Sequence, residues 1–322
     1  MEFSLIDRIS GFTQQRRDDV LLGIGDDAAL LQVPAGQSLV AAVDTMVEGV
    51  HFLPGTAPAD LGWKALAVNL SDLAAMGAIP AWALLAMTLP TGDAAFVDGF
   101  AAGFAALARP HRLALVGGDT TGGPLAFSVT VHGFVPADQA LTRDGAREGD
   151  LVMVTGSVGE GAGGLACLRK YGVQVQDEGA IGQLVTRVRR PRPQLGAGLA
   201  LRGQATACID ISDGLLADLG HICRRSGVGA ELDADRLPLS DALQSVFGAE
   251  QACRFGLSGG DDYELCFTVP ESRAHAVLGD LARIGCSATP IGRIVRGEGV
   301  GVRDASGQWV DIESAGWDHF AA

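Results

Sequence analysis

Six short acidic motifs hold the residues most able to do chemistry. They are Gly-Ile-Gly-Asp-Asp-Ala-Ala (23–29), Val-Asp-Thr (43–45), Asn-Leu-Ser-Asp (69–72), Gly-Gly-Asp-Thr-Thr (117–121), Asp-Ile-Ser-Asp-Gly (210–214) and Gly-Gly-Asp-Asp-Tyr-Glu-Leu (259–265). Most place an aspartate where an apolar stretch gives way to a loop, and ligand crevices of α/β sheets lie beyond such strand ends. A single aspartate of this kind is usually a helix cap or a turn residue. Six motifs of one pattern indicate a shared site.

Carboxylates gathered in one cleft repel each other unless cations lie between them. Mg²⁺ prefers carboxylate and water oxygens and commonly pairs with substrate phosphates. We therefore predict a site for several Mg²⁺ ions, with these carboxylates as ligands: Asp27, Asp44, Asp72, Asp119, Asp210 and Asp213. The glycine pairs at 117–118 and 259–260 would let backbone N–H groups approach phosphate oxygens.

The composition excludes several classes of partner. The chain has 322 residues, 48% apolar and 19% charged, which suits two α/β domains with sizeable cores. A net charge of −14 makes nucleic acid and anionic membranes poor partners. The start of the chain lacks the features of a signal peptide, and the longest apolar run, 79–89, is far short of the ~20 residues that span a bilayer. The six cysteines show no Cys-x-x-Cys spacing, so we expect reduced thiols in a cytoplasmic protein.

Strands and helices alternate in both halves, which predicts an α/β (α+β) fold of two mixed domains. Apolar spacing predicts a helix over 60–77 with Gly77 as its C-cap. We expect the strand within 38–47 to break at its aspartate, and the strand that starts at 113 to become a loop at Gly-Gly-Asp. The polar stretch 136–150 marks the boundary, giving an N-terminal metal- and ATP-binding domain over 1–138 and a C-terminal domain over 149–322.

One Gly-x-Gly-x-x-Gly motif, at Gly159, Gly161 and Gly164, follows a predicted strand and precedes a helix. That context fits a dinucleotide fingerprint, but the acidic residue ~20 positions on, at the end of the next strand, is not evident. A tight strand–helix turn facing a phosphate is favoured over NAD binding. The Walker A and protein-kinase motifs are absent, so an ATP enzyme of this sequence belongs to neither class.

These motifs, in this order, resemble the thiamine-monophosphate kinase family along nearly the whole chain. The matching segments include GIGDDAAL, DTMVEGVHF, NLSDLAAMGA, GGDTTGGPL, ALTRDGA, DISDGLLADLGHI, LSGGDDYELCFTVP and GWDHF. This family shares a superfamily with aminoimidazole ribonucleotide synthetase and selenophosphate synthetase. The resemblance implies two α/β domains of the aminoimidazole ribonucleotide synthetase type, with N-terminal strands pairing across a homodimer. It also implies direct, Mg²⁺-assisted transfer of a phosphoryl group from ATP to thiamine monophosphate, giving thiamine diphosphate and ADP.

The resemblance also assigns roles to individual positions. The metal positions match Asp27, Ala42, Val43, Asp44, Asp72, Asp119, Asp210 and Asp213. The ATP contacts match Gly118, Asp119, Arg143 and Ser212, and the substrate contacts match His51, Asp261 and Trp317. No side chain is expected to act as a covalent or acid–base group, and Asp119 and Asp213 are expected to matter most. Two departures stand out: the family often has glutamate at 261, and residues 42 and 43 keep only backbone carbonyls where some members carry Ser-Thr.

Simpler interpretations exist for the non-acidic positions. His51 by itself is typical of a partly buried structural histidine, Ser212 of an N-cap and Trp317 of an aromatic that docks the tail. Three rival functions stay open. A two-metal phosphatase would use the same aspartates without ATP, and a regulator would bind nucleotide without turnover. The third rival is another enzyme of the superfamily. Selenophosphate synthetase would carry a reactive cysteine near its N-terminus, yet no cysteine precedes Cys167 here.

Overall fold

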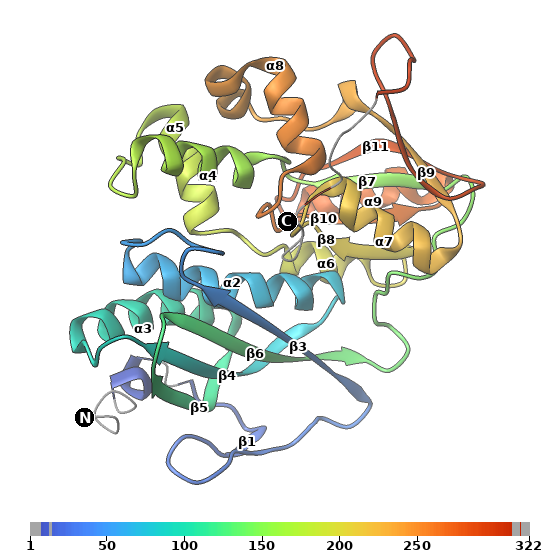
Figure 1. The fold of residues 1–322 in the computed structure, drawn as a ribbon. Helices are drawn as coiled ribbons and strands as arrows, with labels where there is room; N and C mark the ends of the chain where they lie inside the picture. The colour runs from blue at the N-terminus through green and yellow to red at the C-terminus, as the bar shows by residue number, and fades with distance from the viewer. Residues whose placement is uncertain (1–7, 13–14, 311–315, 317–322) are drawn as a thin grey trace. The chain divides into compact units, whose positions relative to one another are not determined.

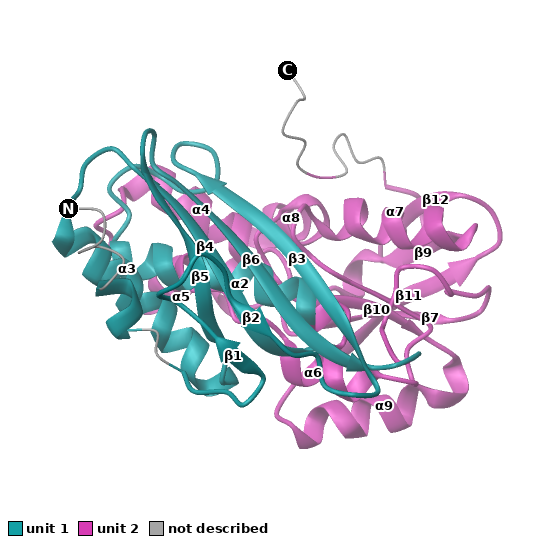
Figure 2. Cartoon of the chain, turned by 90° about the horizontal axis from the view of Figure 1, so that it is seen from below, with its two compact units in different colours: residues 1–73, 78–138 teal, residues 74–77, 139–322 magenta. Residues whose placement is uncertain are grey.

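Each half of the chain is built on a β-sheet of its own (Figure 1). The computed structural model describes residues 8–12, 15–310 and 316. It divides into a first unit, residues 1–73 and 78–138, and a second unit, residues 74–77 and 139–322 (Figure 2). Both units combine helices with sheets, so the predicted mixed α/β fold is confirmed. Among the described residues, no helix is long and apolar enough to cross a membrane.

The first unit holds a four-stranded sheet in the order β3-β6-β4-β5. Its strands are β3 (Gln37–Val47), β4 (Ile79–Leu89), β5 (Ala114–Gly122) and β6 (Ala126–Pro136). Only β4 and β5 run parallel. Helices α2 (Pro58–Ala75) and α3 (Ala94–Ala108) cover one face (Figure 1), and a short 3₁₀ turn, η1 (Arg109–His111), follows α3. The ring centroids of Phe100 from α3 and Phe127 from β6 lie 4.5 Å apart in this layer.

Within the part of the chain that the structure describes, the opposite face of this sheet is covered at one end only. A small ribbon of β1 (Val20–Leu22) and β2 (Leu30–Leu31) packs on Trp82, whose indole Nε1 donates to Asp19 at 3.0 Å. The remainder exposes apolar side chains on and beside the edge strand β3, with exposed fractions of 46% for Leu39 and 61% for Val43. This sheet therefore presents an uncovered apolar surface to solvent.

Two expectations about strand ends were wrong. The strand β3 continues through Asp44 and pairs with β6 over its whole length. The strand β5 likewise continues through Asp119, paired with β4 as far as Gly122. Both aspartates are exposed, so their side chains stay hydrated and the backbone ladder continues past them at little cost. The helix α2 ends as expected, because Gly77 takes the left-handed conformation with φ 64°.

The second unit holds a six-stranded sheet in the order β12-β9-β11-β7-β10-β8. Its strands are β7 (Leu151–Thr155), β8 (Ala207–Asp210), β9 (Gly229–Asp233), β10 (Leu265–Val269), β11 (Ala288–Val295) and β12 (Gly299–Arg303). All neighbours pair antiparallel except β9 and β12.

The helices of the second unit form three groups (Figures 1 and 2). Helix α7 (Leu215–Ser226) lies on one face, while α6 (Leu195–Leu201) and α9 (Glu271–Arg283) pack together on the other. Helices α4 (Glu160–Tyr171), α5 (Gly179–Arg189) and α8 (Asp241–Ser258) pack on one another, and η2 (Ala234–Arg236) is a single 3₁₀ turn. A core between α7 and the sheet includes Ile209, Leu219 and Leu232.

Candidate functional site

Two of the acidic motifs meet where β8 ends and β10 begins. Asp210 ends β8 opposite Leu265, the first residue of β10. Beyond this pair, the two loops stay joined by backbone hydrogen bonds. The N–H of Asp261 donates to Ser212 O at 2.9 Å, and the N–H of Tyr263 donates to Ile211 O at 2.8 Å. The predicted ATP contact Ser212 and the predicted substrate contact Asp261 are therefore direct neighbours in the second unit.

Asp218, in the first turn of α7, holds the first of these loops. Its Oδ2 accepts the N–H groups of Ser212, Asp213 and Gly214 at 3.0, 3.1 and 3.2 Å. Burial and the nearby carboxylates of Asp210 and Asp213 raise the pKa of Asp218 to about 7. The charges of Asp210 and Asp213 thus act on Asp218, and a cation bound beside these three carboxylates would offset their repulsion. Sequence reasoning missed Asp218, although its place in the first helical turn is typical of a capping carboxylate.

The second loop has an unusual backbone. Asp261 has φ 67° and Tyr263 has φ 53°, both in the left-handed region. For residues other than glycine this conformation costs about 1–3 kcal/mol each, and it persists where surrounding contacts fix it. The hydroxyl of Tyr263 donates to Asp261 Oδ1 at 2.8 Å, which orients that carboxylate.

Arg143 lies on the segment that runs past β8 and α7. The carbonyl of its neighbour Thr142 accepts the N–H of Cys208 at 2.8 Å. Its own carbonyl accepts the Ser226 hydroxyl at 3.2 Å. Burial is the largest cause that lowers the pKa of His221, and the charges of Arg224 and Arg143 lower it further. The charge of Asp213 acts in the opposite direction. The charges of Arg143 and Asp213 therefore both act on the imidazole of His221.

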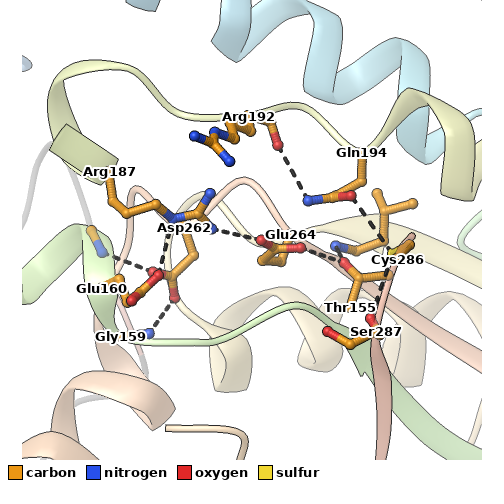
Figure 3. Close-up of polar contacts among 12 residues, drawn as sticks. Thr155, Gly159, Glu160, Arg187, Arg192, Gln194, Asp262, Glu264, Cys286 and Ser287 are labelled. Atoms are coloured by element: carbon orange, nitrogen blue, oxygen red, sulfur yellow. Dashed lines mark hydrogen bonds and ion pairs between the residues drawn. The ribbon is translucent and has the colours of Figure 1, made fainter. Parts of the chain in front are cut away.

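The Gly-x-Gly-x-x-Gly motif is occupied by the protein itself (Figure 3). The carboxylate of Asp262 accepts the N–H of Gly159 at 2.6 Å and the N–H of Gly161 at 2.9 Å. A Cβ on Gly161 would collide with the backbone of Asp261. The motif is thus a tight strand–helix turn, as expected, but an internal carboxylate takes the position foreseen for a phosphate.

A buried ionic cluster supports the same region (Figure 3). Arg187 on α5 pairs with Glu264 at 2.6 Å and with Glu160 at 3.0 Å. Glu264 also accepts the Thr155 hydroxyl at 2.6 Å, and it is 1% exposed. Burial raises the pKa of Glu264, against the lowering effect of Arg187. No local pattern indicates this cluster, because its charged members are of types that usually lie on the surface.

In the first unit, Asp44 and Asp72 lie on the helix-covered side of the sheet. The N–H of Asp44 donates to Asn69 Oδ1 on α2 at 2.9 Å. Asp72 stands three residues after Asn69, so the two share a face of the helix. The Asn-Leu-Ser-Asp motif thereby brings its asparagine to β3 and its aspartate to the same neighbourhood.

Asp119 lies on the other face of the same sheet. One row of aligned residues crosses the four strands: Thr45, Ser128, Ala86 and Asp119. Because aligned side chains share a face and adjacent residues alternate, Asp119 shares the face of Thr45. Gly118 instead aligns with Asp44, whose side chain points to the opposite face. Asp27 is exposed in the loop between β1 and β2. Ala42 and Val43 lie inside β3, paired in register with β6.

His51 is oriented by the turn that follows β3. Its Nδ1 accepts the N–H of Val47 at 3.0 Å, so a neutral ring carries its proton on Nε2. Such an N–H is a suitable donor to a phosphate oxygen. The next residue, Phe52, anchors the turn by stacking on Phe127 at 5.8 Å between ring centroids. Trp317, the third predicted substrate contact, lies outside the described residues.

Carboxylate oxygens are the only side-chain donors of the predicted metal positions, and this donor chemistry fits Mg²⁺. Within residues 8–12, 15–310 and 316, no group of three or more His, Cys, Asp or Glu side chains is placed to hold a metal ion by itself. Mg²⁺ usually takes one or two carboxylates and completes its shell with waters and phosphates. The carboxylates described above suit that mode, and the metal assignment stays a prediction.

Two family profiles match the chain. The profile of the AIR synthase related protein, N-terminal domain, matches residues 25–135, and that of the C-terminal domain matches residues 147–305. Thiamine-monophosphate kinase of Escherichia coli strain K12 is 50% identical over 99% of this chain and 98% of its own length. The protein of that name from Aquifex aeolicus is 34% identical over 99% of this chain and 98% of its own length.

Solved structures agree with these sequence relatives. Thiamine-monophosphate kinase from Stenotrophomonas maltophilia K279a superposes with a TM-score of 0.89 at 49% identity, covering 96% of this chain and 98% of that one. The structure of AaThiL complexed with AMPPCP and TMP superposes with a TM-score of 0.79 at 34% identity, covering 99% of this chain and 97% of that one. The E. coli protein HypE, at 22% identity and a TM-score of 0.73, shares the fold. The chain therefore belongs to the AIR synthase related family and, within it, to the thiamine-monophosphate kinases.

Proposed function

We propose that this chain transfers the γ-phosphoryl group of ATP directly to thiamine monophosphate, giving thiamine diphosphate and ADP. The observation that carries the proposal is the junction in the second unit, where the loop of Ser212 and Asp213 is hydrogen-bonded to the loop of Asp261. The family assigns the first loop to ATP and metal and the second to the acceptor. Full-length similarity to the thiamine-monophosphate kinases supports the same reaction.

The transfer needs alignment more than bond-making groups. An acceptor phosphate oxygen attacks the γ-phosphorus, the bond from that phosphorus to the β–γ bridging oxygen breaks, and its electron pair leaves on ADP. The transition state of such transfers is loose, so charge neutralisation and positioning dominate. The acceptor oxygen is already ionised at neutral pH, so no general base is required.

The chain's own residues would bind and orient the two substrates. Arg143 would neutralise ATP phosphates through its planar guanidinium. The Nε2–H of His51 would donate to the acceptor phosphate. The carboxylate of Asp261, already oriented by Tyr263, would complement the positive thiazolium ring of the acceptor.

Mg²⁺ would be held by the predicted aspartates: Asp27, Asp44, Asp72 and Asp119 in the first unit, and Asp210 and Asp213 in the second. When bound, it would supply positive charge that offsets the repulsion between two polyanionic substrates.

We also infer a homodimer that uses the uncovered face of the first unit's sheet. The edge strand β3 exposes Val43 by 61% and Leu39 by 46%, and Leu84 on β4 is 37% exposed. Exposed apolar patches of this kind usually mark interaction surfaces. Val43→Lys should give monomers in size-exclusion chromatography with light scattering. A variant that stays dimeric would show that β3 is not part of the interface.

We also propose that the protein is cytoplasmic. All six cysteines, which lie within the described residues, are free thiols, and Cys208 and Cys266 are fully buried. Unpaired cysteines are usual in reducing compartments.

The reaction is tested by its product balance. Protein, ATP, Mg²⁺ and thiamine monophosphate are incubated together, and thiamine diphosphate, ADP and inorganic phosphate are measured by chromatography. One ADP for each thiamine diphosphate supports the kinase. Release of inorganic phosphate from thiamine monophosphate without ATP would identify a phosphatase, and nucleotide binding without turnover would identify a regulator.

A further inference from the structure

Asp262 is the inner member of an aspartate pair in the loop before β10. It is 3% exposed, whereas its neighbour Asp261 is half-buried. Both oxygens of Asp262 accept backbone N–H groups from the start of α4, that of Gly159 at 2.6 Å (Figure 3) and that of Gly161 at 2.9 Å. The carboxylate thus satisfies donors that a helix leaves unpaired at its N-terminus, where negative charge is favoured.

This carboxylate lies at the centre of the strained segment. The residues on either side, Asp261 and Tyr263, have the positive φ angles, and their N–H groups donate to Ser212 O and Ile211 O. Asp262 therefore supplies the fixed point on the opposite side of the loop, on α4. Left-handed conformations of non-glycine residues persist only where several such contacts define them.

Helix α4 and the loop are also in direct contact. A Cβ on Gly161 would meet the backbone carbonyls of Asp261 and Gly260. A shift of the first turn of α4 would consequently move the backbone that carries the Asp261 side chain.

We propose that Asp262 is a positioning residue for Asp261. By binding the N-terminus of α4, it fixes the loop conformation that presents the Asp261 carboxylate to thiamine monophosphate. The inference rests on the proposed function and adds a named source of acceptor recognition to it.

The test compares steady-state kinetics of the full-length chain and its Asp262→Asn variant. The amide keeps the size of the carboxylate but leaves one oxygen as acceptor for two N–H donors. We expect the KM for thiamine monophosphate to rise about tenfold, which corresponds to the loss of roughly one hydrogen bond. The KM for ATP should stay within about twofold, since a variant that loses one substrate's contacts alters that KM selectively.

Matched variants separate positioning from simple destabilisation. Asp235→Asn changes an exposed aspartate of η2 and should leave both KM values unchanged. A merely structural Asp262 would lower the thermal midpoint and the amount of active protein, with both KM values normal. That result in Asp262→Asn would overturn the proposal.

If Asp262→Asn does not fold, Gly161→Ala decides, because the added methyl group displaces the Asp261 backbone from the α4 side. A raised KM for thiamine monophosphate alone supports the proposal, and a normal one overturns it. A wild-type chain without turnover of thiamine monophosphate would instead refute the proposed function.

Discussion

Replacing Arg187 with methionine should destabilise the second unit strongly and in a pH-dependent way. The guanidinium pairs with Glu264 and Glu160, whose side chains are 2% and 6% exposed. Removing one partner of a buried ion pair costs about 3–5 kcal/mol, because the remaining charge is left without compensation. At about 2–4 °C per kcal/mol for a unit of this size, the thermal midpoint should fall by roughly 6–20 °C near pH 8.

The sign of the pH dependence follows from Glu264. Its pKa in the folded protein is raised above the ordinary 4.5 by burial. The folded state then binds more protons than the unfolded state, so the stability contribution is largest below 4.5 and is lost as pH rises towards the raised value. Without Arg187 the pKa rises further, so Arg187→Met should lose less stability near pH 5.5 than near pH 8.

Scanning calorimetry at the two pH values measures both effects. Arg254→Met is the matched control, since Arg254 pairs with Glu250 on the surface, where the two side chains are 69% and 84% exposed. Such exposed pairs contribute about 0–1 kcal/mol. An Arg187→Met variant no less stable than this control at both pH values would show that the cluster does not compensate the buried carboxylates.

Three further outcomes are expected. Tyr263→Phe removes the hydroxyl that donates to Asp261 Oδ1, so the KM for thiamine monophosphate should rise about three- to tenfold, and kinetics with an unchanged KM would show that this bond does not orient Asp261. A maleimide should label only the half-buried Cys253 and Cys286 before unfolding, because the other four thiols are buried; mass spectrometry that finds label on Cys208 or Cys266 in folded protein would contradict this burial. Chelation of Mg²⁺ should abolish thiamine diphosphate formation, with recovery on adding the metal back, and turnover that persists in excess chelator would refute the metal requirement.

Local patterns predicted the elements whose signals are carried by neighbouring residues. The helix α2 and its end at Gly77 follow from apolar spacing and a glycine cap. The strand ends at Asp44 and Asp119 were misjudged, because an aspartate disfavours a strand only where its side chain must be buried. Asp44 and Asp119 lie on opposite faces and are both exposed, and this exposure depends on how distant strands and helices pack around them.

In the candidate functional site, too, local patterns predicted some features and not others. Sequence patterns indicated the motifs that hold Ser212 and Asp261, and the structure joins their loops by backbone hydrogen bonds. The patterns gave no basis for separating Asp261 from Asp262, two adjacent acids with opposite environments. Nor did they distinguish Arg187 and Glu264 from surface charges, because their burial arises from the packing of α4 on α5 and from the ion pair that joins α5 to the residue before β10. Long-range contacts, absent from any local window, decide these roles.

Magnesium titrations of thiamine diphosphate formation, followed by ³¹P NMR, test the claim that the dispersed aspartates bind the metal on which transfer depends. For Asp72→Asn and Asp213→Asn, one from each unit, we expect turnover to drop at least about a hundredfold at moderate Mg²⁺, with unchanged thermal midpoints and partial recovery at high Mg²⁺. Wild-type rates and an unshifted magnesium dependence in both variants would contradict the account.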